Sequence, residues 1–294
     1  MYSTNKSTTT VKHRGQLHLI WHQFKKNRLA LVALMVFLFM VAVAIFAPLL
    51  VSYDEQVTAH HMVDRLQSPN AEHPFGTDGY GRDLLARIIW GSRVSLSVGI
   101  YVVGASVLLG GLIGSVAGFF GGKIDNVLMR IMDVFLAVPS TILAVAVVGA
   151  LGPGLVNIII AMSISKTPQF ARIVRSSVIS IGGQEYVEAA RACGTKTSRI
   201  IYRHILPNSL GPLIVQATLQ MGNVILGVSG LSFVGLGIES PTPEWGSMLA
   251  EARENMMYHP YLMIFPGIAI VIAVLSLNLI GDGMRDALDP RMKN

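Results

Sequence analysis

Six long apolar stretches, separated by shorter polar segments, dominate the pattern of this chain. Each is close to the length of about 20 apolar residues that crosses the hydrocarbon core of a bilayer as a helix. They lie at residues 29–51, 94–120, 127–150, 155–181, 209–234 and 260–280. The pattern predicts an all-α polytopic membrane protein with six transmembrane helices, the first at 29–51 and the others within a core at 94–283.

The polar segments set the expected topology. Residues 1–28 form a polar N-terminal segment that ends in an interfacial helix, residues 52–93 a long loop, and residues 284–294 a tail. Six spans place both termini on one side. If that side is the cytoplasm, it holds 17 of the 23 Lys and Arg residues and the other side five, as the positive-inside rule requires. The loop at 52–93 is then extracytoplasmic.

Three of the five outward basic residues, Arg82, Arg87 and Arg93, form a cluster on the side that should be poor in positive charge. The sequence offers Asp78 and Asp83 as partners for them. We expect ion pairs within this loop.

Composition narrows the class of function. Charged residues make up 14% of the chain, against about a quarter of a soluble domain. The net charge of +6 follows from the loop asymmetry and does not indicate nucleic-acid binding. The sequence has no Gly-x4-Gly-Lys-Ser/Thr phosphate loop, no Gly-x-Ser-x-Gly elbow and no metal-ligand spacing. We expect no catalytic residue, metal site or bound cofactor in this chain.

The polar stretch at 184–207 has the pattern of two short helices. They are expected at about 184–193 and 197–205, with a sharp turn at Gly194 and an end before Pro207. The first helix places Tyr186, Ala189, Ala190 and Cys193 near one face and directs Glu185, Glu188 and Arg191 to water or a partner. The pair forms either a knob that fits a socket on another protein or an amphipathic loop on the lipid headgroups.

Glu188-Ala189-Ala190, followed by Gly194 and by Leu206-Pro207, resembles the EAA loop of ABC-importer permeases. In those proteins the loop docks into a groove on the ATP-binding subunit. The resemblance implies a coupling role for Glu185, Tyr186, Glu188, Ala189, Ala190, Arg191, Gly194, Leu206 and Pro207. One departure is His204, where the family often has isoleucine; here Ile205 lies beside it.

Phe75-Gly76-Thr77-Asp78 with Gly81-Arg82-Asp83 resembles the FGTDxxGRD signature of dipeptide, oligopeptide and nickel permeases. The segment 241–246 resembles their last external loop, and 281–290 resembles their tail. The combination resembles the "C" type of permease subunit, with the ABC type I importer permease fold, in the bacterial cytoplasmic membrane.

The resemblance implies a set of partners. These are a homologous permease that completes a heterodimer, two ATP-binding subunits that bind ATP and Mg²⁺, and an extracytoplasmic solute-binding protein. We expect the loops at 52–93 and 235–259 to meet the solute-binding protein, with Trp245 as an interfacial anchor or contact. The implied solutes are di- or oligopeptides, or alternatively nickel chelates or glutathione. A single-chain secondary transporter, the other class considered, should show an internal repeat, and none is apparent.

Polar residues inside the apolar segments are candidates for the translocation pathway. Gln216, Gln220 and Asn223 recur on one face of the fifth segment. They serve either interhelical hydrogen bonds or a wet pathway.

Lys166 is a fourth candidate for the pathway. It is the twelfth residue from Leu155, about 16 Å along a helix, and Pro168 follows it with the potential to kink the helix. A lysine near mid-membrane is costly unless it reaches water. It therefore lines the pathway and attracts a peptide carboxylate, or it snorkels or pairs with a neighbouring carbonyl.

Overall fold

The computed structural model describes residues 21–195, 197–200 and 206–288. The long helices are α2 (Arg28–Leu50), α3 (Leu84–Phe120), α4 (Gly122–Ala137), α5 (Ser140–Leu151), α6 (Leu155–Gly182), α9 (Leu206–Phe233) and α11 (Tyr261–Leu288). The short ones are the π-helix η1 (Tyr53–Thr58), the 3-10 helix η2 (Met62–Asp64), α7 (Glu185–Ala192), α8 (Thr197–Ile200) and α10 (Trp245–Ala252). Among these residues there is one isolated β-bridge and no strand, so the all-α prediction is confirmed.

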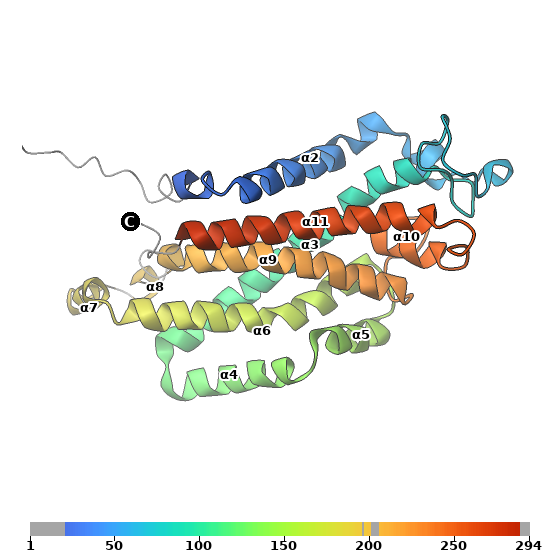
Figure 1. Cartoon of the computed structure of the whole chain (residues 1–294). Helices are drawn as coiled ribbons and strands as arrows, with labels where there is room; N and C mark the ends of the chain where they lie inside the picture. The colour runs from blue at the N-terminus through green and yellow to red at the C-terminus, as the bar shows by residue number, and fades with distance from the viewer. Residues whose placement is uncertain (1–20, 196, 201–205, 289–294) are drawn as a thin grey trace, which may run out of the picture.

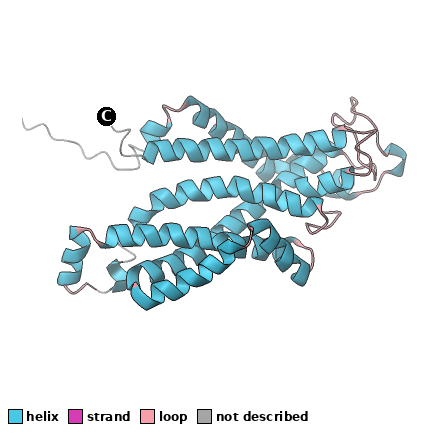
Figure 2. Cartoon of the chain, turned by 60° about the horizontal axis from the view of Figure 1, so that its bottom comes forward, coloured by secondary structure: helices cyan, strands magenta, loops and turns pink. Residues whose placement is uncertain are grey.

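The long helices form an elongated bundle, as Figures 1 and 2 show from two sides. α7 and α8 lie at one end of the bundle, together with both ends of the described chain (Figure 1). α10 and the loop that carries η1 and η2 lie at the other end. We call these the α7 end and the α10 end.

The centre of the bundle is the packing of α3 against α6. Gly110, Gly114 and Gly118 recur every four residues on α3, and each faces the backbone of α6. A Cβ built on Gly110 would lie 2.8 Å from the carbonyl oxygen of Thr167, and one on Gly118 would lie 2.9 Å from that of Arg175. The glycines therefore allow the two backbones to approach closely, as small residues do in membrane helices.

Two apolar clusters extend from this contact. One joins α3, α5, α6 and α9 around buried residues such as Phe170 and Val224. The other joins α2, α3, α10 and α11 around Trp245 and Leu277. Many other apolar side chains of the long helices are exposed, including Phe39, Leu108 and Val271. Exposed apolar surface along the long helices suits a protein whose solvent is lipid.

α3 starts earlier than the sequence predicted. The second span was expected to begin at residue 94, after a loop at 52–93, but α3 begins at Leu84 and continues without a break through Gly91 to Phe120. Asp83 caps it by accepting a hydrogen bond from the amide of Ala86 at 2.7 Å. A single glycine does not end a helix that packs on both sides of it, and the loop therefore ends at Asp83.

The third expected span, 127–150, is bent. α4 and α5 meet at 89° around Val138 and Pro139, where Val138 is extended, at φ −94° and ψ 129°. Proline lacks an amide hydrogen and disfavours helix in the residue before it. By contrast, Pro168 lies inside α6, which runs continuously from Leu155 to Gly182.

Helix length and apolarity alone do not identify all six predicted spans in the structure. In the described part of the chain four helices could cross a membrane on this basis, or five if the bent pair counts as one span. α6 has the length, at 28 residues, but Lys166, Arg172 and Arg175 make it more polar. α11 runs to Leu288, so the helix enters the expected tail at 284–294.

Candidate functional site

The predicted coupling segment forms the tip of the α7 end. Val187 of α7 and Ile200 of α8 are buried against Val178 and Ile181 of α6. Glu185, Glu188 and Ala189 are exposed, which agrees with the expected outward direction of both glutamates. Tyr186 was expected on the opposite face from them, but it is 42% exposed; Val187 takes the buried position instead.

The turn after α7 has the backbone that only glycine adopts easily. Gly194 has φ +72°, and a Cβ there would meet nothing within 4 Å. Its requirement is therefore conformational and not steric crowding. Leu206 and Pro207 begin α9, where proline is tolerated because a first-turn amide has no helical acceptor. Residues 201–205, with the expected end of the second helix and His204, lie outside the described residues.

Lys166 lies halfway along α6 and is half-buried. Its Nζ donates a hydrogen bond to Oγ of Ser140 at 3.4 Å. Ser140 is the first residue of α5, directly after the bend at Pro139. The lysine therefore contacts the bend between α4 and α5. Helix ends at such a bend leave backbone groups without intrahelical hydrogen bonds.

Two ion pairs join α4 to α6 on the α7 side of Lys166. Arg175 binds Asp125 through two hydrogen bonds, Nε to Oδ1 at 2.5 Å and Nη2 to Oδ2 at 2.6 Å. Arg172 Nη2 donates to Oδ1 of Asp133 at 2.5 Å, and these two side chains are 54% and 43% exposed. These pairs were not predicted from the sequence. The available signal was that Asp133 and Arg172 lie about equally far in sequence from the turn at 152–154, which places them at similar heights on the two helices.

The three residues of α9 that were predicted for the pathway have different environments. Gln220 is 5% exposed, and its Nε2 donates to Oε1 of Gln169 on α6 at 2.5 Å. Gln216 is half-buried, and Asn223 is exposed. Gln220 thus makes the interhelical hydrogen bond considered above, while Asn223 presents an amide on the outside of the bundle. The structure joins Gln220 to the helix of Lys166, not to Lys166 itself.

Two arginines of the basic cluster, Arg82 and Arg87, form a buried ion network at the α10 end. Arg82 and Arg87 are 0% and 1% exposed. Both bind Oδ2 of Asp78 at 2.6 Å, and both bind Oε2 of Glu251 on α10 at 2.6 Å. Two guanidinium groups and two carboxylates balance in charge, as buried ions require. The network ties the loop before α3 to α10.

The predicted partners of this cluster were half right. Asp78 pairs with both buried arginines, but Asp83 binds His73 at 2.8 Å and caps α3. Arg93 lies over the ring of Trp90 at 5.1 Å. Glu251, more than 160 residues away in sequence, was not among the expected partners.

Trp245 is a core residue and not an interfacial anchor. It is 1% exposed, and its Nε1 donates to the carbonyl oxygen of Ile88 at 3.2 Å. Glu244 beside it is also buried and caps α10 by accepting hydrogen bonds from the amides of Gly246 and Ser247. The segment 241–246 therefore fixes α10 against α3.

Comparison with known proteins assigns the chain to a family. Residues 110–294 match the model of the binding-protein-dependent transport system inner membrane component, and residues 15–69 match the N-terminal transmembrane domain of oligopeptide transport permease C. The chain belongs to the family of binding-protein-dependent transport system inner membrane components. It is a membrane permease of the ABC-importer type, and the resemblance drawn from the sequence motifs is confirmed.

Curated relatives cover nearly the whole of this permease. The dipeptide transport system permease protein DppC of Alkalihalophilus pseudofirmus is 49% identical over 92% of this chain and 89% of its own. The di/tripeptide permease protein DppC of Pseudomonas aeruginosa is 41% identical over 100% and 98%. The glutathione permease protein GsiD of Pectobacterium atrosepticum is 40% identical over 93% and 91%.

Solved structures support the fold of the permease. A chain of the MetNI methionine ABC transporter, in inward-facing conformations, aligns with a TM-score of 0.57 at 21% identity, over 70% of this chain and 97% of that one. A chain of an amino acid ABC transporter solved with histidines aligns with a TM-score of 0.51 at 16% identity, over 67% and 92%. At these identities the likeness concerns the fold alone, and it agrees with the predicted type I importer permease architecture.

Proposed function

We propose that this permease is one of two homologous subunits that form a pathway for short peptides across the bacterial cytoplasmic membrane. Two partner subunits bind Mg²⁺ and ATP and hydrolyse the nucleotide, this chain is not itself catalytic, and an extracytoplasmic solute-binding protein delivers the peptide. The observation that carries the proposal is the 49% identity to a dipeptide permease over 92% of the chain. Glutathione, itself a modified tripeptide, is the second candidate because of the 40% identity to a glutathione permease.

Reconstitution tests the function. The complete complex in proteoliposomes should accumulate L-alanyl-L-alanine only with ATP, the ATP-binding subunits and the solute-binding protein. Glutathione in place of the dipeptide separates the two candidates. Uptake by this chain alone would contradict the proposal and would favour a single-chain transporter.

The proposed orientation places the α7 end, with both termini, in the cytoplasm. It rests on the asymmetry of the basic residues and on the position of both described chain ends beside α7 (Figure 1). In intact cells a membrane-impermeant maleimide should label Ala71→Cys in a Cys193→Ser background. It should not label Cys193, which is exposed at the α7 end. The opposite labelling pattern would invert the topology.

In this proposal the tip of the α7 end docks on an ATP-binding subunit. The proposed docking residues are Glu185, Tyr186, Glu188, Ala189, Ala190, Arg191, Gly194, Leu206 and Pro207. The exposed Glu185, Tyr186, Glu188 and Ala189 give the tip a mixed acidic and apolar surface, held in place by the buried Val187. Support comes from this geometry and from the EAA resemblance.

Gly194→Ala should uncouple transport. A Cβ at φ +72° costs about 1–2 kcal/mol, so the turn is expected to shift and the tip to lose its docking geometry. We expect solute-stimulated ATPase activity to fall while membrane insertion stays intact. Gly183→Ala is the matched control, because Gly183 has φ −90° and open space around it. Equal activity in the two variants would show that the turn conformation does not matter for coupling.

Lys166, Gln216 and Asn223 are proposed to line the translocation pathway, and the buried Gln220 to hold α9 against α6 beside it through its hydrogen bond to Gln169. The half-buried amino group of Lys166 bonds a neutral hydroxyl, so its charge stays available to a peptide carboxylate. Lys166→Met and Lys166→Glu should both assemble, with peptide uptake reduced in the first and lower still in the second because the charge is reversed. Lys123→Met, at an exposed site on α4, is the control. Normal uptake in both Lys166 variants would make the lysine structural.

A further inference from the structure

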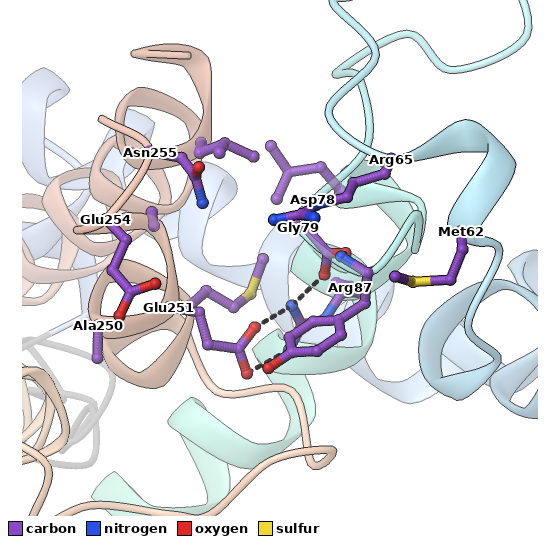
Figure 3. A pocket seen from close by; sticks show the side chains of 14 residues that line it. Met62, Arg65, Asp78, Gly79, Arg87, Ala250, Glu251, Glu254 and Asn255 are labelled. Carbon is purple, nitrogen blue, oxygen red and sulfur yellow. Dashed lines mark hydrogen bonds and ion pairs between the residues drawn. The ribbon is translucent and has the colours of Figure 1, made fainter. Parts of the chain in front are cut away.

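A cavity of about 270 Å³ lies at the α10 end, far along the bundle from the coupling tip. One wall comes from the segment 62–84 before and at the start of α3, and the other from α10 and the turn that follows it. Figure 3 shows the two walls facing each other, with Arg65 on one and Glu254 and Asn255 on the other. Its volume is just below the range of about 300–1,000 Å³ that holds drug-sized ligands. It therefore suits a smaller molecule.

The floor of the cavity is electrically balanced. Asp78, Arg87 and Glu251 line it, and with Arg82 they form the network of two cations and two anions described above. The charges of these groups are paired with one another, although Nε of Arg87 is buried without a hydrogen-bond partner among the residues that the structure describes. The floor offers fixed polar atoms but no net charge to a ligand.

The walls carry opposite charges that are free. Arg65 and Glu254 are both exposed, and neither has an ion-pair partner within 4.0 Å among the residues that the structure describes. They stand on opposite sides of the cavity and do not reach each other (Figure 3). Asn255 adds an amide beside Glu254, and Met62, Met248 and Leu262 add apolar surface to the lining.

We propose that this cavity binds a small zwitterion, an amino acid or a short peptide with free ends. Arg65 binds the carboxylate, for which a guanidinium provides two parallel donors. Glu254 and the side-chain carbonyl of Asn255 accept from the ammonium group, and the methionines contact the carbon chain. The choice of a peptide as the probe rests on the proposed function. The inference that the ligand is a zwitterion rests on the charges of the cavity and not on that function.

Binding of labelled L-alanyl-L-alanine to the permease complex tests the proposal. The complex is held in nanodiscs without the solute-binding protein and without ATP. Saturable binding is expected, and Arg65→Gln or Glu254→Gln should each weaken it about tenfold. N-acetylation of the dipeptide should weaken its binding to the wild type, but it should not weaken binding to Glu254→Gln any further. Amidation of the dipeptide's carboxylate should likewise weaken binding to the wild type but not binding to Arg65→Gln. The control variants are Arg253→Gln and Glu239→Gln, which are exposed nearby but do not line the cavity.

A double variant, Arg65→Glu with Glu254→Arg, controls for the possibility that a single variant loses binding because it misfolds. It restores opposed charges, so it should bind the dipeptide more tightly than Arg65→Glu alone. Absence of saturable binding to the wild type, or unchanged binding in both Gln variants, would overturn the proposal. So would a pattern in which these variants weaken only the docking of the solute-binding protein, because the cavity would then receive a charged side chain of that protein. Wild-type uptake without cavity binding leaves the proposed function intact, and cavity binding without uptake leaves the zwitterion site intact.

Discussion

Arg87→Met is expected to lower the free energy of unfolding by about 3–5 kcal/mol, the usual cost of removing one member of a buried ion pair. The arginine is 1% exposed, and it contributes one of the two positive charges that balance Asp78 and Glu251. Without it the two carboxylates share only Arg82. Equilibrium unfolding of the purified chain in mixed detergent micelles measures the change.

Arg93→Met is the matched control for this prediction. Arg93 lies on the same helix, six residues further on, but it is exposed and lies over the ring of Trp90. Its replacement should cost no more than about 1 kcal/mol. If Arg87→Met is no more destabilising than Arg93→Met, the network does not hold the α10 end together.

A double-mutant cycle isolates the pairing within the network. Arg87→Met with Glu251→Gln removes one charge of each sign and leaves Arg82 paired with Asp78. The double variant should therefore be less destabilised than the sum of the two single variants, with a coupling of about 0.5–3 kcal/mol. Additive effects would mean that Arg87 stabilises through packing instead of charge.

Gly114→Val is expected to disrupt the centre of the bundle. A Cβ on Gly114 would overlap the carbonyl oxygen of Ala171 and lie 2.9 Å from the amide nitrogen of Arg175. Both are backbone atoms of α6, so the clash cannot be relieved by a side-chain rotation. Overpacking of a tight core costs about 1–3 kcal/mol or more, and α3 and α6 must separate to accept the valine.

Gly111→Val is the control, because Gly111 lies on the same helix and has nothing within 4 Å of its built Cβ. The two variants change helix propensity and apolarity equally, so only the close contact differs. We expect the yield of folded protein and its assembly into a complex to fall for Gly114→Val and to stay near wild type for Gly111→Val. Equal yields would show that the two backbones need not approach so closely.

The sequence by itself determined the all-α membrane class, the approximate positions of the spans, the turn at Gly194 and the permease family. These features are local. The length of an apolar run and a positive φ both depend on residues that are near one another in the chain. Motifs such as FGTDxxGRD are likewise read from adjacent positions.

Only the tertiary structure decided which distant groups meet. It paired Arg82 and Arg87 with Glu251, buried Trp245 against α3, joined Arg172 to Asp133, and set Arg65 opposite Glu254 across a cavity. It also turned the third span by 89° at Pro139, where the sequence had suggested one helix. A proline signals a possible break but not its angle, and a charge signals the need for a partner but not its identity, because both depend on how the helices pack.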